Sequence, residues 1–342
     1  MPRRVDNPRN PYRIAGGGYE VEWLGEPPVT EVSVHEEIAK SALVRNDSPD
    51  VPFTWSVNPY RGCQHACAYC YARPGHQTLG FGAGTDFDTQ IVVKTNVEER
   101  LRQELARKRT RGEWIAFSGV TDPYQPLEAS YRLTRACLEA CAEFRIPVGV
   151  ITKSALVRRD VDVLARIAER AGARVFLSIP FADASVARKV EPWAPTPALR
   201  FEALRALHEV GVPTGISISP LIPGLNDADV PELLERARDA GARHAFTILL
   251  RLPNEVRGVF ETRLRDRFPE RADRVMSALE ECRVAQTSRS QFGDRMRGAG
   301  PRWDAIRQLF DLSCRRLGLS TSQDDEVEPL TPAPTERQGT LF

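Results

Sequence analysis

The sequence predicts an α/β fold built around a parallel sheet, with an N-terminal arm before the sheet and a helical extension after it. Short apolar runs of β-type residues recur about every 30 residues, and one helical pattern separates each run from the next. Strands that alternate with single helices form right-handed βα units and therefore a parallel sheet. The six expected strands cover residues 53–57, 114–117, 147–151, 174–179, 213–218 and 245–250.

The N-terminal segment, residues 1–50, is expected to be an irregular arm. It contains many Pro and Gly residues, including Gly16–Gly18 and the pair Pro27–Pro28, and its apolar runs are short. The strand at 53–57 opens the central region, residues 51–254, and leads directly into a group of cysteines.

Helix signals lie between the expected strands. A short additional strand over residues 89–94 is followed by Asn96, which is a favoured N-cap residue. Thr196 is expected to cap a later helix, with Pro197 at its first position and Gly211 just past its end. These signals support one helix after each strand.

The C-terminal extension, residues 255–320, is expected to be helical. Its segment from Arg283 to Arg316 holds eight Arg and no Lys. Beyond it, residues 321–342 are polar and contain several Pro, which predicts a disordered tail.

Composition sets broad limits on function. The chain has 342 residues, of which 42% are hydrophobic and 27% charged, and its net charge is only +1, so the whole-molecule charge does not favour nucleic acid. The first residues have no apolar signal core, and no stretch approaches the roughly 18 apolar residues that span a bilayer. We therefore expect a cytoplasmic protein. Seven cysteines, with three close together, indicate a metal site rather than a disulfide framework.

The candidate site is a group of three cysteines, Cys63, Cys67 and Cys70, with the spacing C-x3-C-x2-C. A tight loop of this kind brings three thiolates together, and thiolates are ligands for soft metal centres. Iron–sulfur clusters usually take four cysteine ligands. A four-iron cluster on this loop would keep one iron for a small molecule, because no fourth cysteine lies nearby. The remaining cysteines are Cys137, Cys141, Cys282 and Cys314.

With Tyr69 directly before the third cysteine, this motif resembles that of the radical S-adenosylmethionine superfamily. The flanking sequences, Asn58–Cys63 and Tyr69–Arg73, resemble the branch that contains spore photoproduct lyase and the DNA repair photolyase-like proteins. The resemblance implies a partial (β/α)6 barrel of the TIM type. It also implies a 4Fe-4S cluster on the three cysteines, S-adenosylmethionine bound at the free iron, and its reductive cleavage to a 5′-deoxyadenosyl radical. An electron donor of the flavodoxin or ferredoxin type would reduce the cluster.

The same resemblance implies cofactor contacts for several residues besides Tyr69. Ser118 and Asp122 follow the second expected strand, where the family meets the methionine amino group. Lys153 ends the third strand, where a cation would meet the cofactor carboxylate, and Ser178 lies near the end of the fourth. In barrels of this kind the chemistry takes place at the C-terminal ends of the strands.

Simpler explanations compete with these assignments. The cysteines could form a zinc site completed by His65 or His76, and the segment after Asp122 could be an ordinary turn. Lys153 could be a solvated surface lysine. Cys137 and Cys141 share an apolar helix face, which favours buried core thiols over ligands.

One departure from spore photoproduct lyase concerns the second strand. That enzyme carries a cysteine there that returns hydrogen to the product radical, whereas this chain has Ala116, Phe117 and Ser118. The departure argues against repair of spore photoproduct itself. Tyr71 and Tyr124 are left as candidate radical relays.

Nucleic acid is the substrate class that the resemblance favours. The segment Arg295–Trp303 mixes guanidinium groups with an aromatic ring, as phosphate and base contacts require, although a solvated helix face also explains it. The segment Gln338–Phe342 resembles the Gln-x-x-Leu-Phe peptide with which bacterial repair proteins dock on the DNA sliding clamp, so the clamp is a candidate partner. The alternative functions are radical modification of a peptide or small molecule, and a non-catalytic iron–sulfur or zinc binding module.

Overall fold

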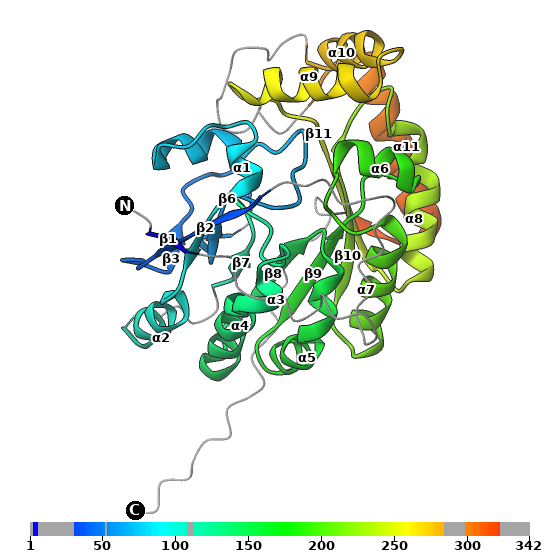
Figure 1. Cartoon of the computed structure of the whole chain (residues 1–342). Helices are drawn as coiled ribbons and strands as arrows, with labels where there is room; N and C mark the ends of the chain where they lie inside the picture. Colours follow the sequence, from blue (N-terminus) through cyan, green and yellow to red (C-terminus); the bar gives the residue numbers. More distant parts are fainter. Residues whose placement is uncertain (1–2, 6–30, 52, 108–112, 284–297, 322–342) are drawn as a thin grey trace, which may run out of the picture.

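The computed structural model describes residues 3–5, 31–51, 53–107, 113–283 and 298–321. Its main feature is a curved sheet of eight strands in the order β12-β11-β10-β9-β8-β7-β4-β3, with helices along its outer side (Figure 1). The strands are β3 (Leu43–Arg45), β4 (Trp55–Val57), β7 (Ile115–Phe117), β8 (Val148–Thr152), β9 (Ala173–Ser178), β10 (Thr214–Leu221), β11 (His244–Leu249) and β12 (Ser320–Thr321).

The six expected strands are confirmed as β4 and β7 to β11, and all five pairings between them are parallel. β12 adds a parallel strand at one edge and β3 an antiparallel strand at the other. The result is the partial barrel that the family resemblance implied. The helices that follow these strands are α4 (Leu133–Phe144), α5 (Val161–Arg170), α6 (Ala184–Val190), α7 (Pro197–Glu209) and α8 (Val230–Asp239).

A second sheet lies beside the first and has the order β1-β2-β6-β5 (Figure 1). Its strands are β1 (Arg3–Val5), β2 (Ser33–Glu37), β5 (Tyr60–Arg61) and β6 (Gln90–Lys94). The expectation that residues 1–50 are irregular is therefore wrong for residues 3–5, 33–37 and 43–45, which are strands. β2 pairs in parallel with β6, so that its partner lies more than 50 residues away and no local pattern reveals it.

Two helix starts differ in how they are capped. The Thr196 hydroxyl accepts a hydrogen bond from Leu199 N, as expected for the cap of α7. Asn96, just before α2 (Val97–Arg107), instead uses its side chain to bind both backbone groups of Ala39, at 2.8 and 3.1 Å. The Asn96 side chain therefore ties the N-terminal segment to the barrel.

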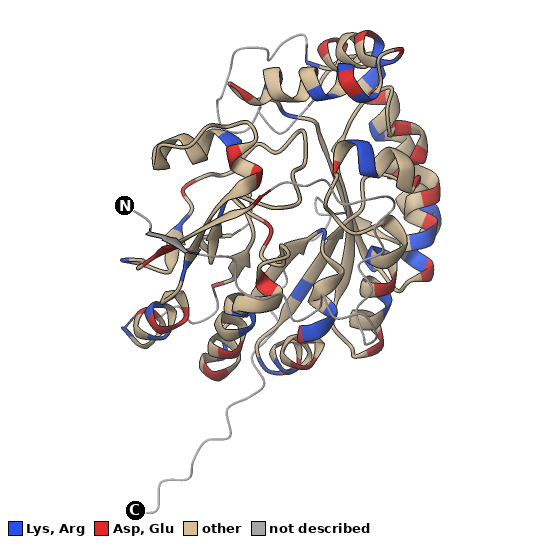
Figure 2. Ribbon diagram, viewed as in Figure 1, with Lys and Arg blue, Asp and Glu red and all other residues tan. Residues whose placement is uncertain are grey.

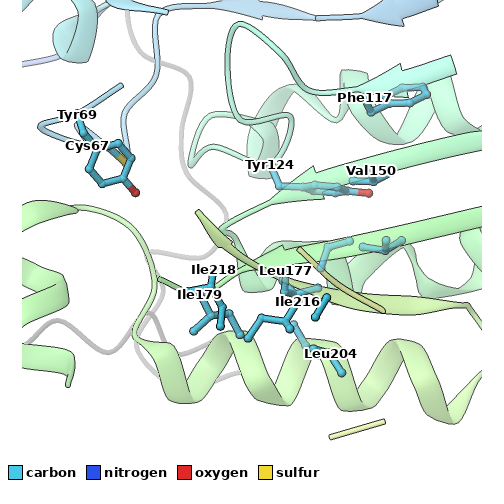
Figure 3. Packing of buried hydrophobic residues seen from close by; sticks show 14 of the residues in the cluster. Cys67, Tyr69, Phe117, Tyr124, Val150, Leu177, Ile179, Leu204, Ile216 and Ile218 are labelled. Atoms are coloured by element: carbon cyan, nitrogen blue, oxygen red, sulfur yellow. The ribbon is translucent and has the colours of Figure 1, made fainter. Parts of the chain in front are cut away.

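The core fills the space between the sheet and the outer helices. Alternate residues of neighbouring strands, among them Val150, Leu177 and Ile216, are fully buried in one cluster with Leu164 and Leu204 of the helices. Figure 3 shows Leu204 beside Ile216 and Leu177. The intervening residues of the same strands face the concave side of the sheet.

The C-terminal extension is helical, as expected, and consists of α9 (Val256–Arg267), α10 (Ala272–Glu281) and α11 (Pro301–Leu317). α11 packs along α8 (Figure 1). Arg316 and Glu235 form a 2.6 Å salt bridge between these two helices. Positive and negative side chains are interspersed along the outer helices (Figure 2). Among the described helices, none combines the length and the apolar character that crossing a membrane requires.

Replacing Leu204 with Ala should lower the free energy of unfolding by about 2–5 kcal/mol, because it leaves a cavity where the side chain is fully buried. Leu312→Ala is the matched control, since Leu312 on α11 is 51% exposed and its loss should change stability by about 0.5 kcal/mol or less. Urea unfolding of the two variants checks this. Equal losses would contradict the described packing.

Candidate cofactor site at the cysteine loop

The cysteine loop, residues 62–72, follows β5 and brings three thiols together. Cys63 and Cys67 are buried, and Cys70 is partly exposed. Burial raises the pKa of each thiol, and the nearby carboxylates, Asp122 for Cys63 and Glu191 for Cys67, raise it further together with the neighbouring thiols. Cofactor binding by these thiols therefore has to supply the free energy of deprotonation.

A fully buried arginine, Arg73, stabilises the conformation of this loop. The Arg73 guanidinium donates to the carbonyl of Cys67 at 2.8 and 3.2 Å and to that of Gly84 at 2.7 Å. It also forms a 2.8 Å salt bridge with Asp88, whose second oxygen binds Arg263 of α9 at 2.6 Å. Arg263 donates in turn to the carbonyl of Ala66, at 2.9 Å. The C-terminal extension thus contributes directly to the cysteine loop.

The segment after β7 holds the loop from the other side. The Gln125 side chain accepts from Gln64 N at 3.0 Å and donates to Gly62 O at 3.2 Å. The Gln64 side chain accepts from Leu127 N at 2.8 Å. The segment that follows Asp122 is therefore more than a turn, because it provides partners for the polar backbone groups of the cysteine loop.

The Asp122 carboxylate is saturated by donors from the protein. It accepts from the Thr152 hydroxyl at 2.6 Å, from Lys153 N at 2.7 Å and from Tyr124 N at 2.9 Å. His65 Nδ1 lies 3.3 Å from its second oxygen. Burial alone would raise the pKa of Asp122, but His65 and the hydrogen bonds lower it to about 2. Asp122 joins the cysteine loop to the end of β8.

Lys153 and Ser178 meet at the C-terminal ends of β8 and β9, beside Tyr69. Lys153 Nζ donates to Ser178 Oγ at 2.6 Å and lies 5.6 Å from the centre of the Tyr69 ring. The Tyr69 hydroxyl donates to Glu191, which lies just beyond α6 and forms a 2.5 Å salt bridge with Arg200 of α7. The structure therefore brings together the predicted residues Tyr69, Lys153 and Ser178. Sequence patterns gave no indication of Glu191 or Arg200.

Ser118 lies farther along the same edge of the sheet, directly after β7. Its side chain is partly exposed, and its hydroxyl makes no hydrogen bond to the described residues. The adjacent Gly119 carbonyl accepts a 2.5 Å hydrogen bond from the Tyr71 hydroxyl, so that the ends of the cysteine loop and of the β7 segment are in contact.

Other potential ligands are occupied elsewhere. His76 Nε2 lies 2.9 Å from Gln90 O, and its ring stacks on Phe81. Cys137 and Cys141 are fully buried in the core on α4. Over the described residues, no group of three or more His, Cys, Asp and Glu side chains surrounds a position for a single metal ion.

Several arginines described in the extension pair with neighbouring carboxylates, whereas Arg283 donates to the backbone carbonyls of Leu249 and Leu250. Arg302 forms a 2.6 Å salt bridge with Glu281. Trp303 is only 6% exposed, so the expectation that it stacks on bases is wrong. The side chain packs into the core because it occupies the apolar face of α11. Residues 284–297 and the segment Gln338–Phe342 lie outside the described residues.

Residues 57–237, more than half of the chain, match the radical SAM superfamily. The chain belongs to the radical SAM superfamily. Radical SAM enzymes use an iron–sulfur cluster and cleave S-adenosylmethionine, and they need an electron donor.

Relatives within this superfamily cover most of the chain. An uncharacterized protein of Mycobacterium bovis is 39% identical over 253 residues, which are 72% of this chain and 74% of that protein. A radical SAM Nα-GlyT isomerase of Pseudomonas phage M6 is 28% identical and aligns with 77% of this chain and 52% of its own length. Spore photoproduct lyase complexed with dinucleoside spore photoproduct superposes with a TM-score of 0.61 over 88% of this chain and 87% of that one. At 16% identity, this likeness shows a shared fold.

Replacing Arg73 with Met should lower the free energy of unfolding by about 3 kcal/mol, because it leaves buried carbonyls and part of Asp88 without a partner. It should also reduce the iron bound per chain after anaerobic reconstitution, since the Cys67 carbonyl is no longer held. Arg205→Met is the control, because Arg205 is exposed on α7. Full iron loading of Arg73→Met would show that the loop folds without this guanidinium.

Proposed function

We propose that this radical SAM protein is an enzyme in which Cys63, Cys67 and Cys70 hold a 4Fe-4S cluster with one iron open to S-adenosylmethionine. Three thiols on a single loop, without a fourth cysteine on it, support this ligand set. A cluster binds each thiolate through a different iron, so its ligands need not converge on one point. Once reduced, the cluster and S-adenosylmethionine would supply a 5′-deoxyadenosyl radical that removes hydrogen from the substrate.

The observation that carries this proposal is a largely buried cation beside the cysteine loop at the C-terminal edge of the barrel. Lys153 has a side chain only 15% exposed and points its ammonium toward Ser178 and the Tyr69 ring. We assign the carboxylate of S-adenosylmethionine to Lys153 and polar contacts with the cofactor to Ser178 and Ser118. The Tyr69 ring would line the same cofactor site.

Asp122 has a different part in this proposal. Its oxygens are already taken by protein donors, so we assign it to positioning rather than to the methionine amino group. It fixes the Lys153 backbone relative to the cysteine loop. Arg73 and Gln125 serve the same end by satisfying the backbone of that loop.

For the substrate we propose a nucleic acid, at the level of a base. The support is similarity to the phage isomerase, together with a fold shared with spore photoproduct lyase. The chain has Ala116, Phe117 and Ser118 on β7, so hydrogen return by a cysteine of that strand is not part of the proposal. An electron donor of the flavodoxin or ferredoxin type would deliver the electron.

The reconstituted protein should form 5′-deoxyadenosine from S-adenosylmethionine in the presence of dithionite. Cys67→Ala should abolish this and lower the iron content, because it removes a thiolate ligand. Cys137→Ala should retain both, since Cys137 lies in the core on α4. Chromatographic detection of 5′-deoxyadenosine, with iron quantified in parallel, is the measurement. A wild-type protein that holds only zinc, or that leaves S-adenosylmethionine intact, would overturn the proposal.

Substrate class is tested by following deuterium between the deoxyadenosyl group and candidate substrates. A single-stranded oligonucleotide should exchange deuterium with it, and binding should weaken as salt increases, because phosphate contacts release counterions. A peptide library and a metabolite extract serve as the matched alternatives. Exchange with peptides or metabolites and not with the oligonucleotide would refute the nucleic-acid assignment while leaving the radical chemistry intact.

A further inference from the structure

A single buried carboxylate joins three parts of the proposed cofactor site. Glu191 is fully buried. Its Oε1 accepts a hydrogen bond from the Tyr69 hydroxyl and lies 3.7 Å from Lys153 Nζ. Its Oε2 lies 2.5 Å from Arg200 Nη2. Glu191 thus connects the cysteine loop, the end of β8 and α7, which are far apart in sequence.

The carboxylate is held in place from behind. Arg200 is 1% exposed, and its other nitrogens donate to Pro195 O and to Ser178 O, each at 2.8 Å. Since the guanidinium fork is planar and its two other contacts are to backbone carbonyls, the nitrogen that binds Glu191 is held in place and Glu191 has little freedom to move. Because Lys153 Nζ lies beside Glu191, the fixed carboxylate also restricts where the Lys153 ammonium can lie.

The charges of this group do not balance. Two cations, Lys153 and Arg200, face one carboxylate, Glu191. Burial alone would raise the pKa of Glu191, but Arg200 and Lys153, with the Tyr69 hydroxyl, hold it below its usual value, so Glu191 is charged. A buried excess of positive charge is costly unless another anion completes it. The Lys153 ammonium retains a donor beyond those directed at Ser178 and Glu191.

We infer that Glu191 is a positioning residue that holds the Lys153 ammonium ready for the carboxylate of a zwitterionic amino-acid group. The incoming carboxylate completes the charge balance, while Glu191 keeps Lys153 from turning toward solvent. Glu191 itself does not touch the ligand. The inference rests on the proposed function, because it takes S-adenosylmethionine as the ligand.

The test compares two ligands that differ by one carboxylate, S-adenosylmethionine and decarboxylated S-adenosylmethionine. Their dissociation constants are measured by anaerobic equilibrium dialysis on the reconstituted full chain. The dissociation constant of decarboxylated S-adenosylmethionine divided by that of S-adenosylmethionine reports how strongly the carboxylate is recognised. The Lys153→Met variant shows what ratio remains without the ammonium. We expect the ratio of this variant to be about tenfold or more below that of the wild type.

Glu191→Gln should reduce the ratio nearly as much as Lys153→Met, because Lys153 then loses its counter-charge and is repelled by Arg200. The double variant should be no worse than Lys153→Met alone, since both changes act through the same ammonium. Glu202→Gln on α7 is the matched control; Glu202 is exposed and pairs only with Arg158 among the described residues, so the ratio should stay at the wild-type value.

A general structural role for Glu191 would weaken both ligands equally and leave the ratio unchanged, which would overturn the inference. An increased ratio would also overturn it, because Glu191 would then compete with the ligand. If Glu191→Gln does not fold, Glu191→Asp is the second variant. It keeps the negative charge on a side chain that is one methylene shorter and therefore farther from Lys153, and the ratio should still fall. Lack of binding to the wild-type protein, or a wild-type ratio in Lys153→Met, would instead refute the proposed function or its lysine assignment.

Discussion

The structure depends on keeping three cysteine thiols, two of them buried, together on a loop that has no regular secondary structure of its own. Such a loop cannot satisfy its own backbone polar groups, so side chains from other parts of the chain must do so. Arg73 and Arg263 bind its carbonyls from one side, and Gln125 binds it from the other. The segment after β7 and the C-terminal extension therefore belong to the site as much as the barrel strands do.

The same constraint explains the two buried carboxylates on either side of β8. Asp122 accepts the backbone N–H of Lys153, and Glu191 lies next to its ammonium. The lysine is thus held at both ends, although its side chain has many rotamers when free. Each carboxylate also contacts the cysteine loop, Asp122 through His65 and Glu191 through Tyr69. A ligand that meets Lys153 would meet a cation whose position relative to the thiols is already set.

Surface charge contributes little to this arrangement. The outer helices carry both signs interspersed, and Arg302 and Arg316 of the extension pair with carboxylates of neighbouring helices (Figure 2). Exposed pairs of this kind contribute about 0–1 kcal/mol each. The charged groups with a structural part to play are the buried ones around the cysteine loop.

The sequence by itself determined the strands of the barrel, the order of its βα units and the three cysteines, because each rests on a local signal. Apolar runs and their period identify an element wherever it packs, and the cysteines lie on one short loop. The tertiary structure alone decided the pairing of β2 with β6, the saturation of Asp122 and the burial of Trp303. It also decided the role of Glu191, whose contact with Tyr69 spans 122 residues. Such contacts arise from how elements pack in space, and neither composition nor periodicity records which distant side chains will face each other.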